Sequence, residues 1–194
     1  MASYYYFVAT LPSLQAANTV PPMPYAEFLE RASRFLTAKD MAKLEAARLF
    51  LPADGIIPKA AASSRLLARY CRWELALRNE LARLRAGRLQ KPVEKHLKAG
   101  DPEWDGLKTA QAAFQAEDPL QGELLIERDR WSFIEALSAN KYFDIEYLVS
   151  YALLLQALER RALFNAELGQ QEYRTVYRSV LDTADYRDES GEQK

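Results

Sequence analysis

The chain has 194 residues, of which 49% are hydrophobic and 27% are charged, and its formal net charge is −1 at pH 7. This length suits one domain with a sizeable core, and the composition excludes a disordered or membrane-embedded chain. A net charge so close to zero gives no overall attraction to nucleic acid or to an anionic membrane surface.

Apolar residues recur at helical spacing through most of the chain, so we expect an all-α fold, an irregular bundle of about six or seven helices. The spacing predicts helices over 25–36, 38–51, 63 or 64 to 86, 104–114, 120–137, 145–168 and 171–183. Three tyrosines at 4–6 favour a strand by propensity, but no other segment offers a partner strand. We therefore expect this segment to be helical or extended and to pack against the bundle.

Local sequence also indicates where helices begin and end. Thr37 precedes Asp40 by three residues, which is typical of a helix cap, and Asp118 precedes Pro119 as a cap with proline at the first helical position. Gly87 can end the long helix. The connectors at 12–24 and 87–103 are expected to be the most mobile, residues 1–183 to form a single helical domain, and residues 184–194 to be a disordered tail.

Three acids, Glu74, Glu127 and Glu159, lie on apolar helical stripes. A buried carboxylate is unfavourable unless it is paired, and the planar guanidinium of arginine is the better partner. The candidate buried pairs are Glu74 with Arg78, Glu127 with Arg130, and Glu159 with Arg161. Such pairs would fix how the helices register against each other, with little net gain in stability. The alternative is that the stripes are partly exposed and the acids lie at their rim.

Acids that project inward from several helices are also the raw material of a carboxylate-bridged metal bundle, which is an alternative function. Such a bundle needs Glu-x-x-His on two helices, but the residues three after Glu74, Glu127 and Glu159 are Leu, Arg and Ala. The chain has one histidine, His96, and one cysteine, Cys71. The sequence therefore predicts no metal, no other cofactor and no catalytic triad, and it contains no Walker-type phosphate loop.

Basic residues form one candidate surface for binding a partner protein. Arg65, Arg69 and Arg72 are spaced i, i+4 and i+7, so they share one face of a helix. Glu74 and Glu80 interrupt the basic stripe, which favours a solvated or partner-binding face over nucleic acid. An acidic partner helix would suit this stripe.

Aromatic residues form a second candidate surface. Tyr147 and Tyr151 lie one helical turn apart, close in sequence to Tyr142 and Phe143. Core packing is the default explanation for such a cluster. A partner interface is the alternative, because tyrosine is enriched there.

Two stretches carry a resemblance to a known family. The first is SYYYFVATLP at 3–12, and the second is FDIEYLVSYALL at 143–154, followed by ERR at 159–161. Together they resemble a small family encoded among the subunits of bacterial V/A-type ATPases, the rotary proton- or sodium-translocating enzymes. The second stretch is also distantly similar to the cup-shaped stalk subunit of those ATPases.

The resemblance implies a non-catalytic accessory or central-stalk subunit that couples or stabilises rotor and membrane ring through protein–protein contacts. Its partners would be the rotor shaft and the membrane-ring subunits. It would be cytoplasmic and peripherally associated with the membrane through the ATPase, without direct insertion. The chain is much shorter than the cup-shaped stalk subunit, so it could supply only part of that cup. An unrelated cytosolic helical scaffold is the alternative.

Overall fold

The computed structural model describes residues 4–100, 106–164 and 175–178, and all regular structure within them is helical, which confirms the all-α fold. The helices are α1 (Tyr4–Ala9), α2 (Tyr25–Ser33), α3 (Ala38–Glu45), α4 (Lys59–Ala62), α5 (Arg65–Arg88), α6 (Leu107–Gln115), α7 (Pro119–Ser138) and α8 (Ile145–Ala162). The tyrosine-rich start is therefore helical, as α1, and it packs on the bundle through Phe7, which is buried.

The chain divides into two units, Met1–Arg161 and Ala162–Lys194. The first unit contains every contact discussed below. In the second unit, residues 175–178 are helical, within the helix expected over 171–183. The expected tail at 184–194 lies outside the described residues.

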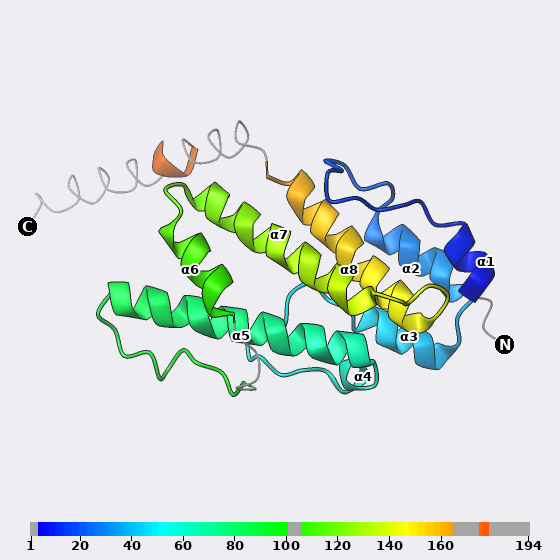
Figure 1. Ribbon diagram of the computed structural model, residues 1–194, viewed down its shortest axis with the longest axis horizontal. Helices are drawn as coiled ribbons and strands as arrows, with labels where there is room; N and C mark the ends of the chain where they lie inside the picture. The colour runs from blue at the N-terminus through cyan, green and yellow to red at the C-terminus, as the bar shows by residue number, and fades with distance from the viewer. Residues whose placement is uncertain (1–3, 101–105, 165–174, 179–194) are drawn as a thin grey trace, which may run out of the picture. The chain divides into compact units, whose positions relative to one another are not determined.

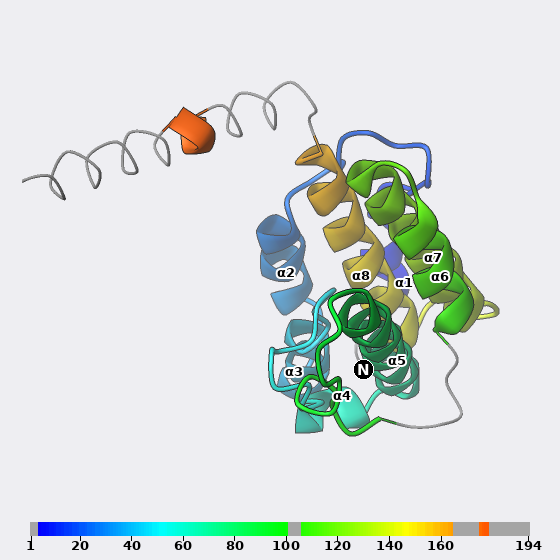
Figure 2. The same cartoon turned by 90° about the vertical axis from the view of Figure 1, so that its left-hand side faces the viewer.

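The central element of the first unit is α8. Figures 1 and 2 show it running between α2 on one side and α7 on the other. From Leu148 to Leu158 every residue except Gln156 is buried, so α8 is apolar around its circumference, as expected of a helix enclosed by others. Even so, no helix in the described part of the chain is both long enough and apolar enough to cross a membrane.

Polar side chains on α8 satisfy backbone groups of other segments. The Glu146 carboxylate accepts hydrogen bonds from the Ser64 hydroxyl at 3.0 Å, the Arg65 amide at 3.2 Å and the Leu66 amide at 2.8 Å. Because the first amides of a helix have no partner within it, Glu146 caps the start of α5 from 80 residues away. Its negative charge also complements the positive end of the α5 dipole.

Glu159 has the same kind of role, and the predicted pair of Glu159 with Arg161 is wrong. The Glu159 carboxylate accepts the Tyr25 amide at 2.6 Å, at the start of α2, where Pro24 offers no side-chain cap. Arg161 instead donates to the Ala16 carbonyl. Residues two apart on a helix point to different sides, so Glu159 and Arg161 meet different neighbours.

Two expected caps are present, and one expected helix end is wrong. The Thr37 side chain accepts the Asp40 amide, and Asp118 accepts the amide that follows Pro119. The helix α5 passes through Gly87 and ends at Arg88. Its closing residue is Gln90, in the left-handed region with φ of +53°. The Gln90 and Lys91 amides there bond back to the carbonyls of Gly87 and Ala86, a Schellman arrangement.

Tertiary contacts also shorten the second predicted helix, which ends at Glu45 and not at 51. The backbone beyond it bonds to side chains from other helices. The Gln156 amide donates to the Ala47 carbonyl at 2.7 Å, and its side-chain oxygen accepts the Leu49 amide at 3.2 Å. The Tyr70 hydroxyl donates to the Leu49 carbonyl at 2.7 Å. These bonds replace the helical ones and hold the segment against the core.

The connector after α5 also returns to the bundle. Asn79, which is buried in α5, donates to the Lys98 carbonyl at 2.9 Å and accepts the Lys98 amide at 3.0 Å. The connector is therefore anchored to α5 at Lys98, although most of its residues from 89 to 100 are exposed. Beyond it, Gly106 starts α6 against α5, so closely that an added Cβ would lie 2.7 Å from the Leu77 Cα.

Candidate interaction surfaces

A buried ionic network joins α5, α7 and α8. Arg130 is 3% exposed and lies between Glu74 and Glu127, which are 1% and 0% exposed. Its Nε and Nη2 lie 3.3 and 3.1 Å from Glu74 Oε2, and its Nη1 donates to Glu127. Arg78 completes the Glu74 site from one turn along α5, at 3.1 Å. The structure thus brings together Glu74 with Arg78 and Glu127 with Arg130, and one arginine bridges both acids.

The network continues to α8 through Arg160. Its Nη2 donates to Glu123 at 2.8 Å, and its Nη1 lies 3.6 Å from Glu127 Oε1. Glu127 Oε2 is buried without a hydrogen-bond partner among the described residues. Burial raises the pKa of Glu127, although Arg130 and Arg160 oppose this rise. The network therefore sets the register of three helices. At its centre is the Glu127 carboxylate, of which only Oε1 accepts a hydrogen bond among the described residues.

Phe50 covers the network on its solvent side. Its ring lies 5.7, 5.1 and 5.0 Å from the guanidinium carbons of Arg78, Arg130 and Arg160. Such cation–π contacts are favourable, and they hold the segment after α3 against the ionic network. The arrangement is typical of a structural network that holds helices together, since its arginines and glutamates form ion pairs with each other. Across the described residues, no group of three His, Cys, Asp or Glu side chains could hold a metal ion.

The predicted basic stripe lies on the first turns of α5. Arg65, Arg69 and Arg72 are all exposed, and Arg65 lies in the first turn, at the positive end of the helix dipole. A cation in the first turn is unfavourable by about 0.3–1 kcal/mol. Glu146 offsets part of this cost from α8. The helix dipole therefore gives no reason for the stripe, which stays a candidate for binding an acidic partner.

For Tyr151 the structure confirms core packing, the default explanation of the aromatic cluster, and overturns the alternative of a partner interface. Tyr151 is 3% exposed: its ring packs on Phe28 at 5.2 Å between centroids, and its hydroxyl donates to the Pro12 carbonyl at 3.0 Å. Tyr151 is thus a core residue and cannot contact a partner. Tyr147 is half-buried and packs against Tyr151 at 6.5 Å. Tyr151 is buried because Phe28 of α2 and Pro12 in the segment after α1 pack against it.

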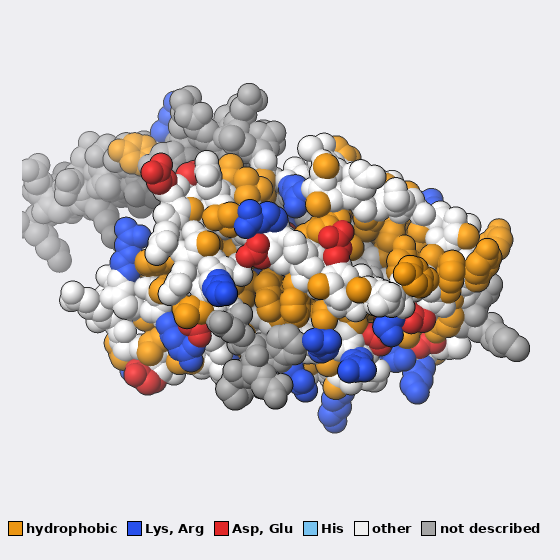
Figure 3. All heavy atoms as spheres, viewed as in Figure 1, with side chains coloured by type: hydrophobic (Ala, Val, Ile, Leu, Met, Phe, Trp, Pro, Cys, Tyr) orange, Lys and Arg blue, Asp and Glu red, His pale blue; other side chains and the backbone are white. Residues whose placement is uncertain are grey.

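Four exposed aromatic side chains lie at the end of the bundle where α1 meets the start of α8. Tyr5, Tyr6, Tyr142 and Phe143 are 70, 59, 63 and 51% exposed, and we call them the aromatic patch. The Tyr5 and Phe143 rings lie 4.8 Å apart between centroids in a tilted arrangement, and Tyr6 lies 5.6 Å from Phe35. Figure 3 shows hydrophobic side chains gathered there, at the right of the view. The four rings expose on the order of 500 Å².

The sequence holds a partial signal for this patch. Tyr142 and Phe143 belong to the aromatic cluster, and the tyrosine run opens the chain. On a short helix, consecutive residues cannot all face the core, so burial of Phe7 forces Tyr5 and Tyr6 outward. What the sequence lacks is the pairing of α1 with the start of α8, which makes one patch from two separate segments.

Comparison with known proteins adds no further constraint: no family model matches the chain, and no characterised protein or solved structure shows significant similarity to it.

Proposed function

We propose that this chain is a non-catalytic accessory or central-stalk subunit of a bacterial V/A-type ATPase, which acts through protein–protein contacts on the cytoplasmic side of the membrane. The observation that carries the proposal is the aromatic patch. It is formed by the two stretches that resemble the ATPase-associated family, at 3–12 and 143–161, together with Tyr142 beside the second. The rotor shaft and the membrane-ring subunits are the proposed partners.

Contacts between the two stretches support this assignment. The Tyr151 hydroxyl donates to the Pro12 carbonyl at 3.0 Å, and the Tyr5 and Phe143 rings pack in a tilted arrangement with centroids 4.8 Å apart. A resemblance split between the ends of a chain is more meaningful when both parts build one surface. Here Tyr151 and Pro12 form a partly buried contact, and Tyr5 and Phe143 contact each other within the exposed patch.

The chemistry of the patch favours a protein partner. Contiguous exposed apolar surface of several hundred Å² marks interaction sites on monomeric proteins, and tyrosine is enriched among the residues that dominate binding. A stalk role also requires stiff helices, because torque is passed mechanically. The buried α8 and the ionic network across α5, α7 and α8 are consistent with that requirement.

The test is affinity capture of the tagged full chain from its own host in mild detergent, with quantitative mass spectrometry of the ATPase subunits. We expect the rotor-shaft and membrane-ring subunits to be recovered together. The double substitution Tyr6→Ser and Tyr142→Ser should reduce their recovery. The matched control is Val20→Ser with Ile56→Ser, which removes exposed apolar side chains outside the patch.

A third variant tests the basic stripe separately. Reversal of charge at Arg65, Arg69 and Arg72 should lower recovery if the stripe forms a second contact with the ATPase. Absence of ATPase subunits from the capture, while the bait is folded and intact, would remove the proposal. The cytosolic scaffold would then be the better description of this protein.

A further inference from the structure

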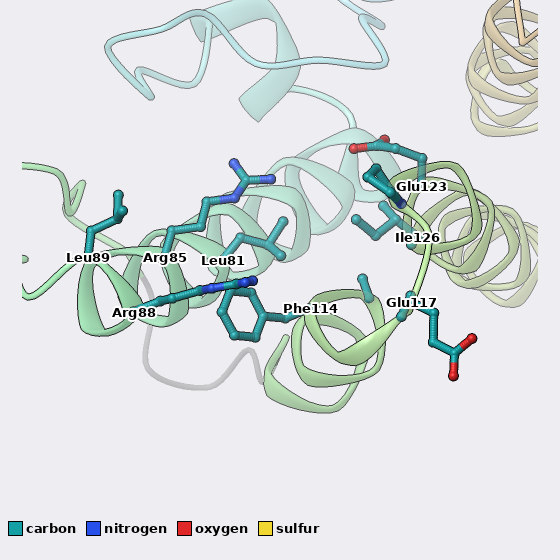
Figure 4. Close-up of a pocket in the computed structure, with 12 residues that line it drawn as sticks. Leu81, Arg85, Arg88, Leu89, Phe114, Glu117, Glu123 and Ile126 are labelled. Carbon is teal, nitrogen blue, oxygen red and sulfur yellow. The ribbon is translucent and has the colours of Figure 1, made fainter.

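A groove lies between α5, α6 and α7, on a part of the first unit away from the aromatic patch. It encloses about 600 Å³. Its floor is apolar, formed by side chains from these helices and their ends: Leu81, Leu89, Ala113, Phe114, Pro119 and Ile126. Figure 4 shows Arg85 and Arg88 extending along its α5 side, with Glu123 at the α7 end and Glu117 turned away.

The two arginines are the unusual feature of this groove. On the same helix, Arg78 is paired with Glu74 and Arg83 with Glu80. Arg85 and Arg88 form no ion pair with any carboxylate in the described part of the chain. Arg88 instead lies over the Phe114 ring at 5.7 Å. Both cations thus border apolar surface with their hydrogen-bonding capacity available.

The acids near the groove do not neutralise this side. Glu123 accepts a hydrogen bond from Arg160 at 2.8 Å and so belongs to the ionic network. Glu117 points out of the groove. The charge left facing the groove is therefore positive and confined to the α5 rim.

We infer that this groove binds an amphipathic helix of a partner protein, with the apolar face of that helix on the floor and acidic residues along one edge, against Arg85 and Arg88. Helix-in-groove binding places apolar residues at i, i+3 or i+4, and i+7 into such a floor. The end of α5, from Leu81 to Arg88, together with the capping residue Leu89, matches the length of that pattern.

Exposure of the groove favours a helix over a small anionic amphiphile. Small ligands bury about 70–90% or more of their surface in their sites. Here Leu89 is 63% exposed and both arginines are exposed, so an acyl chain would stay largely in water. A helix, which is about 10–12 Å wide with its side chains, would cover this exposed apolar surface. This inference is independent of the ATPase proposal, because it specifies the chemistry of the partner segment and not its identity.

The experiment is photo-crosslinking in the native host. The photoreactive residue p-benzoylphenylalanine replaces Leu89 in the full chain, and the linked peptide is sequenced by mass spectrometry. We expect one protein segment with apolar residues at helical spacing and Glu or Asp along one edge. The same probe at Val20, which is 70% exposed elsewhere, should not link to that segment.

Charge reversal then tests the arginines. Arg85→Glu with Arg88→Glu should lower the crosslink yield at least about tenfold, because like charges facing across an interface are strongly unfavourable. Lysine in place of the acids of the linked segment should restore it. Arg83→Glu is the matched control, with little expected change, since Arg83 does not line the groove. Equal unfolding midpoints for these variants would show that the fold is intact.

Four outcomes would overturn the inference. These are no crosslink at 89, a linked segment without an acidic edge, a yield that Arg85→Glu with Arg88→Glu leaves unchanged, and an adduct with the mass of a lipid in place of a peptide.

Discussion

Replacing Arg130 by Met should destabilise the protein more than any single change at its surface. Arg130 is buried and contacts two buried carboxylates. After the substitution Glu74 keeps Arg78 at 3.1 Å, but Glu127 keeps only Arg160, at 3.6 Å. Leaving a buried charge without its partner costs about 3–5 kcal/mol, so we expect a loss of about that size near pH 8.

The loss should depend on pH in a defined direction. Burial already raises the pKa of Glu127, so the folded state binds the proton of the Glu127 carboxyl group more tightly than the unfolded state does. The contribution of Glu127 to stability therefore falls as pH rises through its folded pKa. Removing Arg130 removes a cation that lowers this pKa, and the pKa rises further. The cost of Arg130→Met should consequently be smaller near pH 5 than near pH 8.

The assay is urea unfolding followed by tryptophan fluorescence, since Trp73 and Trp131 are buried. A loss of about 3–5 kcal/mol corresponds to a midpoint shift of roughly 1.5–2.5 M urea. Adding Glu127→Gln should recover about 1–3 kcal/mol near pH 8, because a buried amide costs less than a buried lone charge. A loss below about 1 kcal/mol, or a loss that is the same at both pH values, would refute this reasoning.

Three further predictions concern helix ends and close contacts, and each is read from the free energy of unfolding. Gly106→Ala should cost about 1–3 kcal/mol, because its Cβ would meet the backbone of Leu77. Gly87→Ala is its control and should stabilise by about 0.5–1 kcal/mol, since nothing lies within 4 Å; equal effects would contradict both. Gln90→Gly should stabilise by about 1 kcal/mol by relieving the positive φ, and a loss would show that this conformation is not maintained in solution. Glu146→Ala should cost about 1–2 kcal/mol through the lost cap of α5, whereas an unchanged midpoint would exclude that role.

The helices themselves could be predicted because their information is local. The 3.6-residue spacing indicates all-α structure, and the caps at Thr37 and Asp118 depend only on side chains within three residues of the amides they accept. Burial of Glu74 and Glu127 is also foreseeable, since each lies among apolar residues on its stripe. The arginine that bridges them, Arg130, is predicted from the sequence as the partner of one acid only.

Only tertiary structure decided the roles that depend on distant segments. Glu159 caps α2 because the fold brings Tyr25 next to it, although the two residues are 134 positions apart in the sequence. The spacing of residues within α8 gives no information about a contact with so distant a residue. Tyr151 is buried because α2 and the segment after α1 cover it, whereas Phe143, on the same stretch, stays exposed. Helical periodicity specifies which residues share a face. Which face is covered, and by what, is settled when the helices pack.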